Sequence, residues 1–461
     1  MGTTDKHGGL DTLFQKKSTL GIIASMALPT IASQLIGVVY NYADSIYVGW
    51  LNQPEQVAAI ALALPLLLLI TALSNFWGIG GGSAVSRSLG QKHRQKSGMF
   101  SSFSFYGAFS SSMFLSVISW LMGDRLIRIL GASETVLPYA RDYFFWFFTI
   151  GAVPSVLSTF LAHLVRAEGY AKQAGTGLIL GALLNILLDP FFIFQFGFGM
   201  GVAGAALATM ISNLFSVLYF AYIVFRSRST TSLSFHPLKS VVPWKMAAEV
   251  MSVGLPSALL MLLSAISNNV LNSLVASHGD RTIAAVGIAK KLDLLPNHIS
   301  LGITQGSLPL MAYAFAAGKH EKLKDILYTT MKVSFLSLMT VVILLEIFAR
   351  PMALMFIRDD ETVRYATSFI RILCLSVPLF SMTSTINSFF QAINRPRTAF
   401  ILSLIRKGML DIPLMILFNA LFFVTNIIWV QPIMDLFTVC ISLVVARCFW
   451  RTHSFDSDMT A

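Results

Sequence analysis

The chain has 461 residues, of which 55% are hydrophobic and only 12% are charged. Soluble domains carry about 25% charged residues, so the composition excludes a soluble fold and predicts a polytopic membrane protein. The formal net charge is +11, and the three cysteines show neither CxxC nor metal-ligand spacing. Neither a disulfide framework nor a zinc site is therefore expected.

Twelve apolar stretches are long enough to cross a bilayer core of about 30 Å. They centre on residues 19–47, 56–86, 98–122, 139–165, 173–195, 200–225, 246–276, 283–315, 326–349, 365–393, 398–423 and 425–449. The sequence thus predicts an all-α integral membrane protein of twelve transmembrane helices. Its expected parts are an N-terminal tail, a six-helix bundle, a linker, a second six-helix bundle and a C-terminal tail, at 1–18, 19–225, 226–245, 246–450 and 451–461.

Lys and Arg residues concentrate on the side of the predicted spans that holds both termini. The opposite side has only Arg125, Arg128, Arg141, Arg281, Arg350, Arg358 and Arg364. This excess predicts that the termini and the linker are cytoplasmic and that the chain lies in the plasma (inner) membrane. Because the positive charge is spread over many short loops rather than one basic face, no nucleic-acid partner is expected.

The two halves of the chain show a weak internal repeat. Leu28-Pro29 recurs as Leu255-Pro256 and Asn41 recurs as Asn268, both at an offset of 227, and the run 58–63 resembles 284–289. Each half holds six spans, an even number, so the repeats run parallel and are related by a pseudo-two-fold axis along the membrane normal. Two such bundles around a midplane cavity are typical of secondary transporters.

Two carboxylates fall within apolar spans, Asp44 in the first and Asp189 in the fifth. Each costs several kcal/mol in the membrane unless it is paired, protonated or bound to a cation, which favours a functional role. Asn41 and Asn185 share helix faces with these acids, and Thr209 adds a hydroxyl from the sixth span. Oxygen ligands suit hard cations, and the same carboxylates can instead carry a proton. The sequence leaves Na⁺ and H⁺ both open.

Further candidates lie near the two acids. Tyr40 is four residues before Asp44 and is expected, with Asn41, to line a substrate cavity. Pro29 and Pro190 are expected to act as hinges, because proline bends a transmembrane helix. Pro190 directly follows Asp189, where we expect it to unwind a turn and free backbone carbonyls.

Charged residues also occur in the C-terminal half. They are Lys290, Lys291 and Asp293 in the eighth span, and Arg406, Lys407 and Asp411 in the eleventh. Their spacing predicts either local ion pairs between residues three or four apart, or a charged wall on the cavity formed by Lys290, Lys291 and Asp411. Leu271 stands in the repeat near the position that corresponds to Asp44, so the N-terminal bundle is predicted to be the ion-responsive one.

Several segments carry a family resemblance. They are Leu28-Pro29, 40–44, Val48-Gly49, 166–169, 185–190, 201–209 and 305–309. Together they resemble the multidrug and toxic compound extrusion (MATE) transporters of the multidrug/oligosaccharidyl-lipid/polysaccharide flippase superfamily. The resemblance implies antiport of cationic amphipathic drugs against Na⁺ or H⁺.

The resemblance also implies a cation site at Asp44, Asn185, Asp189 and Thr209. The NorM-like branch has a further acidic residue in the seventh helix, which helps to form a cation site in the C-terminal half. Residues 262–267 read Leu-Leu-Ser-Ala-Ile-Ser instead. The chain is therefore more similar to the DinF-like and MepA-like branches.

Two alternatives remain. A lipid-linked oligosaccharide or polyprenyl-precursor flippase of the same superfamily would need a cationic cavity, which Lys290 and Lys291 would suit. An intramembrane enzyme is not expected, since no HExxH or GxSxG motif occurs and His163 and His298 are isolated and interpreted as structural. We expect no cofactor, a monomer, contact with membrane lipid, and cationic amphipathic drugs as substrates.

Overall fold

The computed structural model describes residues 9–16, 18–227, 230–235, 243–276, 279–421 and 424–452, and the elements in this part of the chain are helices. The tail residues 1–8 and 453–461 and the linker residues 236–242 lie outside the described residues. A short helix α1 (Leu10–Lys16) precedes two lobes. The N-lobe comprises α2 (Thr19–Gly49), α3 (Pro54–Gly90), α4 (Arg94–Ile129), α5 (Leu137–Phe144), η1 (Phe145–Ile150), α6 (Ala152–Ala167), α7 (Ala171–Ile193) and α8 (Val202–Arg226). The C-lobe comprises α9 (Trp244–Ala276), α10 (Asp280–Ala316), α11 (His320–Leu354), α12 (Asp360–Cys374), α13 (Ser376–Ala392), α14 (Pro396–Leu404), η2 (Ile405–Asp411), α15 (Ile412–Leu421), α16 (Val424–Ile427) and α17 (Val430–Thr452).

Helices occupy all twelve predicted span ranges. Nine described helical segments are long and apolar enough to cross a membrane, and the pair formed by Leu137–Ile150 and α6, bent by 48°, brings the number to ten. The two remaining predicted spans, α10 and α14 to α15, carry the charged residues that the sequence places there, which lowers their hydropathy. The twelve-helix, two-bundle architecture is confirmed.

Helix ends follow the local sequence. Ser18 caps α2 by accepting a hydrogen bond of 3.2 Å from the Gly21 N–H, as expected for a serine N-cap. At the other end, α6 is followed by Gly169 with φ +96°, and α13 is followed by Asn394 with φ +58°. Glycine and asparagine adopt this left-handed conformation most readily, so they end these helices at corresponding places in the two halves.

The two lobes also share irregular helices. In the N-lobe the π-helix η1 separates α5 from α6, and at the corresponding place in the C-lobe Leu375 separates α12 from α13. The second π-helix, η2, ends at Asp411, whereas α7 is regular up to Asp189. A π-turn accommodates one extra residue. The repeat also differs by one residue just after η2, because Asp189-Pro190 is matched by Asp411 and Pro413 with Ile412 between them.

The lobes meet through two reciprocal helix pairs, α2 with α10 and α3 with α9. In each pair the first helix of one lobe packs on the second helix of the other, as a pseudo-two-fold axis requires. The approach of α3 and α9 depends on Gly254, where an added Cβ would lie 2.0 Å from the Phe76 carbonyl oxygen. A larger residue at this contact would force the helices apart.

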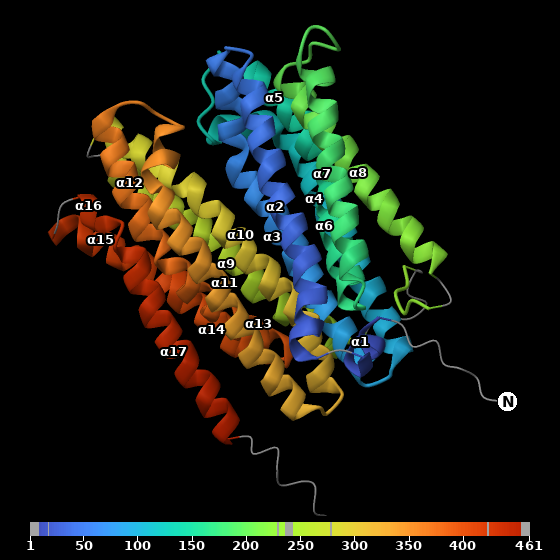
Figure 1. Cartoon of the computed structure of the whole chain (residues 1–461). Coiled ribbons are helices and arrows are strands. Elements are labelled where there is room, and N and C mark those ends of the chain that lie inside the picture. Colours follow the sequence, from blue (N-terminus) through green and yellow to red (C-terminus); the bar gives the residue numbers. More distant parts are fainter. Residues whose placement is uncertain are drawn as a thin grey trace, which may run out of the picture.

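Figure 1 shows α1 and the C-terminal end of α17 at the same end of the molecule, while the lobes diverge toward the opposite end. At the end with the termini, Arg87 of α3 forms an ion pair of 2.8 Å with Glu249 of α9. The same guanidinium donates to the Ala392 carbonyl oxygen at 3.2 Å. These bonds join the lobes at this end.

Short segments before α2 and after α8 pack on the lobes. In α1, the Leu10 N–H donates to the Glu168 carbonyl oxygen at 3.2 Å, and Asp11 accepts a hydrogen bond from Tyr313 of α10. The Glu168 carboxylate accepts hydrogen bonds from Thr231 and Ser232, which fixes the described part of the linker on the N-lobe. Burial raises the pKa of Glu168, and these hydrogen bonds oppose that shift.

Candidate functional site

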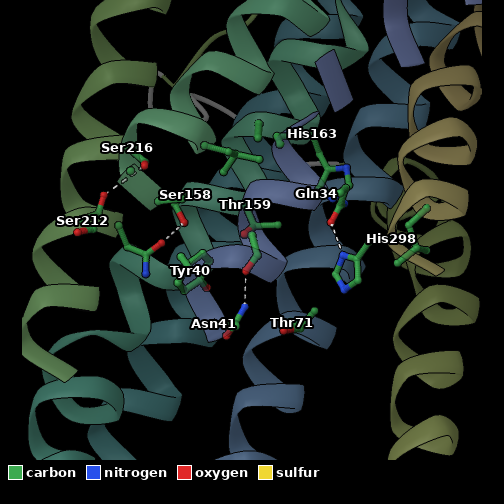
Figure 2. Close-up of a pocket in the computed structure, with 18 of the residues that line it drawn as sticks. Gln34, Tyr40, Asn41, Thr71, Ser158, Thr159, His163, Ser212, Ser216 and His298 are labelled. Atoms are coloured by element: carbon green, nitrogen blue, oxygen red, sulfur yellow. Dashed lines mark hydrogen bonds between the residues drawn. The ribbon is translucent and has the colours of Figure 1, made fainter. Parts of the chain in front are cut away.

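A central cavity of about 250 Å³ lies inside the N-lobe and opens against the C-lobe. Its walls come from α2, α3, α6, α7 and α8, and Met261, His298, Leu301 and Gln305 of the C-lobe close one side. Figure 2 shows how polar side chains converge on it from several helices. The lining residues with polar side chains in the N-lobe are Ser33, Gln34, Tyr40, Asn41, Thr71, Asn75, Ser158, Thr159, His163, Arg166, Asn185, Thr209, Ser212, Asn213 and Ser216.

The predicted residues Tyr40, Asn41, Asn185 and Thr209 all line this cavity. The Asn185 Nδ2 atom lies 3.2 Å from Oδ1 of Asp189 and 3.3 Å from the Thr209 hydroxyl oxygen. Asn185 therefore links α7 to α8 and separates Asp189 from the cavity surface.

Asp44 and Asp189 form a carboxyl pair behind that wall. Asp189 is fully buried and Asp44 is half-buried, and the two carboxyl groups are close enough to interact with each other. Oδ1 of Asp44, Oδ2 of Asp189 and Oδ1 of Asn185 are buried and have no hydrogen-bond partner among the described residues. Buried polar atoms are nearly always hydrogen-bonded, so three such oxygens in one place are a functional signal.

The packing of α2 on α7 explains why the two acids meet. An added Cβ at Gly175 of α7 would lie 2.6 Å from the carbonyl oxygen of Pro29 in α2, so the helix backbones touch there. Asp44 follows Pro29 by 15 residues and Asp189 follows Gly175 by 14. Both helices start at the same end of the molecule, and a rise of 1.5 Å per residue carries both acids about 21 to 23 Å from that contact. They arrive at the same depth.

The two predicted hinge prolines lie within continuous helices. Pro29 is inside α2, and the Thr30 hydroxyl next to it donates to the Met26 carbonyl oxygen at 2.8 Å. Pro190 is inside α7, which continues to Ile193. The expectation that Pro190 unwinds a turn of this helix is therefore wrong. The chain leaves the helix only at Phe194, which is extended.

Three residues near the cavity are not predicted as site residues from the sequence. Tyr143 of α5 is buried close enough to Tyr40, Asp44 and Asp189 to interact with them electrostatically. It is one of 12 tyrosines and has no distinctive spacing, so only the fold selects it. His163 and His298, interpreted as structural, both line the cavity.

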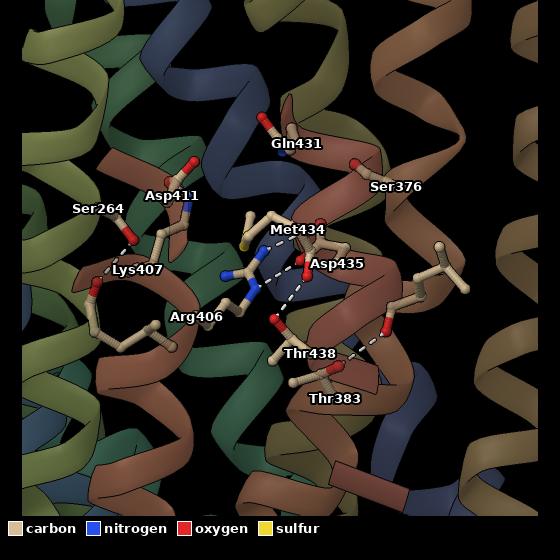
Figure 3. Close-up of polar contacts among 12 residues, drawn as sticks. Ser264, Ser376, Thr383, Arg406, Lys407, Asp411, Gln431, Met434, Asp435 and Thr438 are labelled. Carbon is tan, nitrogen blue, oxygen red and sulfur yellow. Dashed lines mark hydrogen bonds and ion pairs between the residues drawn. The ribbon is translucent and has the colours of Figure 1, made fainter. Parts of the chain in front are cut away.

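The C-lobe charges form a separate cluster (Figure 3). Lys407 forms the predicted ion pair with Asp411 at 2.7 Å, and the Ser267 hydroxyl donates to the same carboxylate at 2.6 Å. Arg406 pairs with Asp435 of α17 at 2.8 Å. Buried cations and anions are thus neutralised within the cluster.

The other charged residues of the C-lobe also lie apart from the central cavity. Lys290 donates to Gln431 at 2.9 Å rather than pairing with Asp293. Lys290 and Asp411 line a small second cavity between α9, α10, α12, η2, α15, α16 and α17. The Lys291 carbonyl oxygen accepts a hydrogen bond of 2.6 Å from Tyr42, which joins α10 to α2.

Comparison with known proteins decides the family. A family model described as MatE matches the chain twice, at residues 29–191 and 256–417. The chain belongs to the MatE family. The two matches start at Pro29 and Pro256 of this MATE protein, which confirms the internal repeat. The family assignment made from the motifs is also confirmed.

Relatives agree with this assignment. The MATE chain is 32% identical over 437 residues to a multidrug export protein MepA of Staphylococcus haemolyticus, covering 94% of each chain. It is 30% identical over 419 residues to MepA of Staphylococcus aureus strain MSSA476, covering 90% of this chain and 91% of the relative. An outward-facing MATE family transporter of the MOP superfamily superimposes with a TM-score of 0.90 at 24% identity, covering 98% of this chain and 99% of the other, which supports the fold.

Proposed function

We propose that this MATE transporter exports cationic amphipathic compounds by antiport, with H⁺ or Na⁺ moving in the opposite direction through alternating access. Its similarity to MepA multidrug export proteins supports the export of small molecules. The observation that carries the coupling step is the set of three unpartnered buried oxygens on Asp44, Asp189 and Asn185.

The unpartnered oxygens of Asp44, Asp189 and Asn185 favour the binding of a proton or a metal cation between α2 and α7. Two ionised carboxylates in contact repel strongly when they are shielded from water, and neither has a cationic side chain within ion-pair distance among the described residues. A proton shared between Asp44 and Asp189 would remove that repulsion. Na⁺ would do so as well, with Asn185 and Thr209 supplying neutral oxygens. Either ion holds α2 and α7 together when bound.

Coupling requires that ion and drug favour different conformations. The acids lie between α2 and α7, and α2 also packs on α10 of the other lobe. Neutralising the pair therefore changes the strength of the α2–α7 contact without touching α10. We infer that this shifts α2 about Pro29 and α7 about Pro190, narrows the cavity beside Tyr40 and Asn41, and releases the drug.

The arrangement of charge sets the proposed orientation. The Lys- and Arg-rich loops lie on the side of the termini, so we place both termini in the cytoplasm and the divergent end of the lobes outside the cell. The protein is then a monomeric, multi-pass carrier in the plasma (inner) membrane, surrounded by lipid and needing no cofactor.

Transport in proteoliposomes tests the proposal. Na⁺ and pH gradients are imposed separately and ethidium export is measured for the wild type, Asp44→Asn, Asp189→Asn and the exposed control Asp360→Asn. One of the two gradients should drive export by the wild type and by Asp360→Asn, and neither gradient should drive it in the other two variants. Full export by both Asp44→Asn and Asp189→Asn would overturn the proposal.

A further inference from the structure

Arg166, at the end of α6, is a buried cation without a counter-charge. Its side chain lines the central cavity, and the residue is only 2% exposed. No described carboxylate lies within ion-pair distance, Nε has no hydrogen-bond partner, and Nη1 lies 3.3 Å from Nδ1 of His163. An unpaired buried charge costs several kcal/mol, so the position of Arg166 needs an explanation.

Other buried cations of the described chain show what a structural arginine or lysine looks like here. Arg87 pairs with Glu249 at 2.8 Å, Arg406 with Asp435 at 2.8 Å, and Lys407 with Asp411 at 2.7 Å. Each of these cations is held by a carboxylate. Arg166 instead faces a cavity whose described lining contains two histidines and no carboxylate.

The neighbours of Arg166 hold its guanidinium in place without neutralising it. Because Arg166 donates to Nδ1 of His163, the histidine is neutral and carries its proton on Nε2. That atom lies 3.2 Å from Oδ1 of Asn75 on α3. The chain from Arg166 through His163 to Asn75 therefore orients the guanidinium, and its remaining N–H donors stay free for an anionic group.

The cavity is long enough to separate two charges on one ligand. Ser158 and Arg166 both line it and are eight residues apart on α6, which corresponds to about 12 Å. Ser158 donates to Asn213 at 2.8 Å, one helical turn from Thr209 on α8. One end of the cavity thus lies next to the Asn185 and Thr209 wall, and the other lies at Arg166.

We propose that Arg166, positioned by His163 and Asn75, forms a subsite for the carboxylate of a zwitterionic amphiphile. The cationic end of the same molecule lies toward Asp44 and Asp189, where negative charge is available. A guanidinium binds a carboxylate through two parallel hydrogen bonds, which gives direction as well as affinity. The inference rests on the proposed function, because it assigns a substrate class to the same cavity.

A matched pair of fluorescent dyes tests the subsite. Rhodamine 110 carries a free carboxylate, and rhodamine 123 is its cationic methyl ester. Binding to the purified, full-length protein is measured by fluorescence anisotropy, and gradient-driven export is measured in proteoliposomes. The variants are Arg166→Met, Arg166→Lys and the control Arg226→Met, which removes an exposed arginine outside this cavity.

If Arg166 binds the carboxylate, removing it should weaken the binding of rhodamine 110 and not that of rhodamine 123. Arg166→Met should weaken rhodamine 110 binding about tenfold, as expected for a lost charge-assisted hydrogen bond, and change rhodamine 123 binding less than about twofold. Arg166→Lys should give an intermediate loss, and Arg226→Met should leave both dyes unchanged. Equal losses for both dyes, or no loss for either, would overturn the subsite. If Arg166→Met does not fold, wild-type protein that fails to prefer rhodamine 110 overturns it as well.

Two further measurements distinguish a failure of the Arg166 subsite from a failure of the antiport proposal. Dioctanoyl phosphatidic acid is a lipid phosphate, and if it binds in an Arg166-dependent way while the dyes show no selectivity, the zwitterion assignment is overturned in favour of a lipid ligand. If neither dye is exported under any ion gradient, the antiport proposal fails. The anisotropy measurement still decides whether Arg166 recognises the carboxylate.

Discussion

The N-lobe and the C-lobe descend from one repeat but differ in how most of their buried charges are paired. In the C-lobe, Lys407 and Asp411 bond to each other and Arg406 bonds to Asp435, while the buried Asp293 forms no ion pair among the described residues. In the N-lobe, Asp44 and Asp189 face each other without a cation, and Arg166 faces the cavity without an anion.

The contrast shows what buried charge does in each lobe. Neutralised clusters hold helices together, whereas charges left without partners next to a cavity are available to ligands. The positions of the cavities agree with this division of roles. The polar cavity of about 250 Å³ lies in the N-lobe, whereas the C-lobe charges border only a much smaller cavity. Function is therefore expected to depend on the N-lobe, and stability on the C-lobe cluster.

Matched acid variants should show the largest difference between the two lobes. Asp189→Asn should reduce gradient-driven export per folded molecule more than about a hundredfold, because it removes the ionisable group that carries the coupling ion. Asp411→Asn should leave export per folded molecule within about threefold of the wild type, since its partner Lys407 serves packing. Flux in proteoliposomes, normalised to folded protein, checks both, and equal loss in the two variants would refute the division of roles.

The same two variants should differ in the opposite direction in their free energy of unfolding. Asp411→Asn leaves Lys407 buried without a counter-charge, so we expect a loss of about 3–5 kcal/mol in the free energy of unfolding. Asp189→Asn removes the repulsion between two carboxyl groups and should therefore not lower the free energy of unfolding. Unfolding in mixed detergent micelles measures both. The double variant Lys407→Met/Asp411→Leu should recover most of the loss, and a double variant as unstable as Asp411→Asn would contradict the ion-pair explanation.

The contact between the lobes gives a third, smaller effect. Glu249→Gln weakens the bond to Arg87 and should favour opening at the end with the termini by about 1–3 kcal/mol. Ser83 of α3 is fully buried between the lobes, where its hydroxyl donates to the Gln391 carbonyl oxygen of α13 at 3.1 Å. In a cysteine-free background carrying Ser83→Cys, labelling of this cysteine by a maleimide from that side should rise several-fold when Glu249→Gln is added. Glu346→Gln is the control, since Glu346 pairs with Arg371 at 3.3 Å inside the C-lobe. Unchanged labelling in Glu249→Gln would show that this pair does not hold the lobes together.

The smallest expected effects separate Na⁺ from H⁺. Thr209→Val keeps the shape of the side chain but removes the hydroxyl next to Asn185. If the coupling ion is Na⁺, its half-saturating concentration should rise about tenfold, the equivalent of about 1.4 kcal/mol. If it is H⁺, the pH dependence of export should hardly move. Ser267→Ala, which loses one hydrogen bond to Asp411, should cost about 1 kcal/mol of stability and leave ion dependence unchanged.

The amino-acid sequence is enough to predict the number of spans, the repeat, the family and the two intramembrane acids. Each of these depends on local information: the length of apolar runs, the cost of a carboxylate in lipid, and matching motifs. The residues Tyr40, Asn41, Asn185 and Thr209 could be predicted near the site because they share helix faces or motifs with the acids.

Which charged residues lie next to each other depends on how the helices pack. Asp44 and Asp189 reach one depth because α2 and α7 touch at Pro29 and Gly175, and the π-helix η2 interrupts the helical run from α14 to α15 that carries Asp411. Spacing along one helix fixes a shared face but not which neighbour that face meets. The segment 166–169 therefore indicates the family without indicating that Arg166 lines the cavity. Crossing points and helix rotation come from packing between distant segments, and no local pattern encodes them.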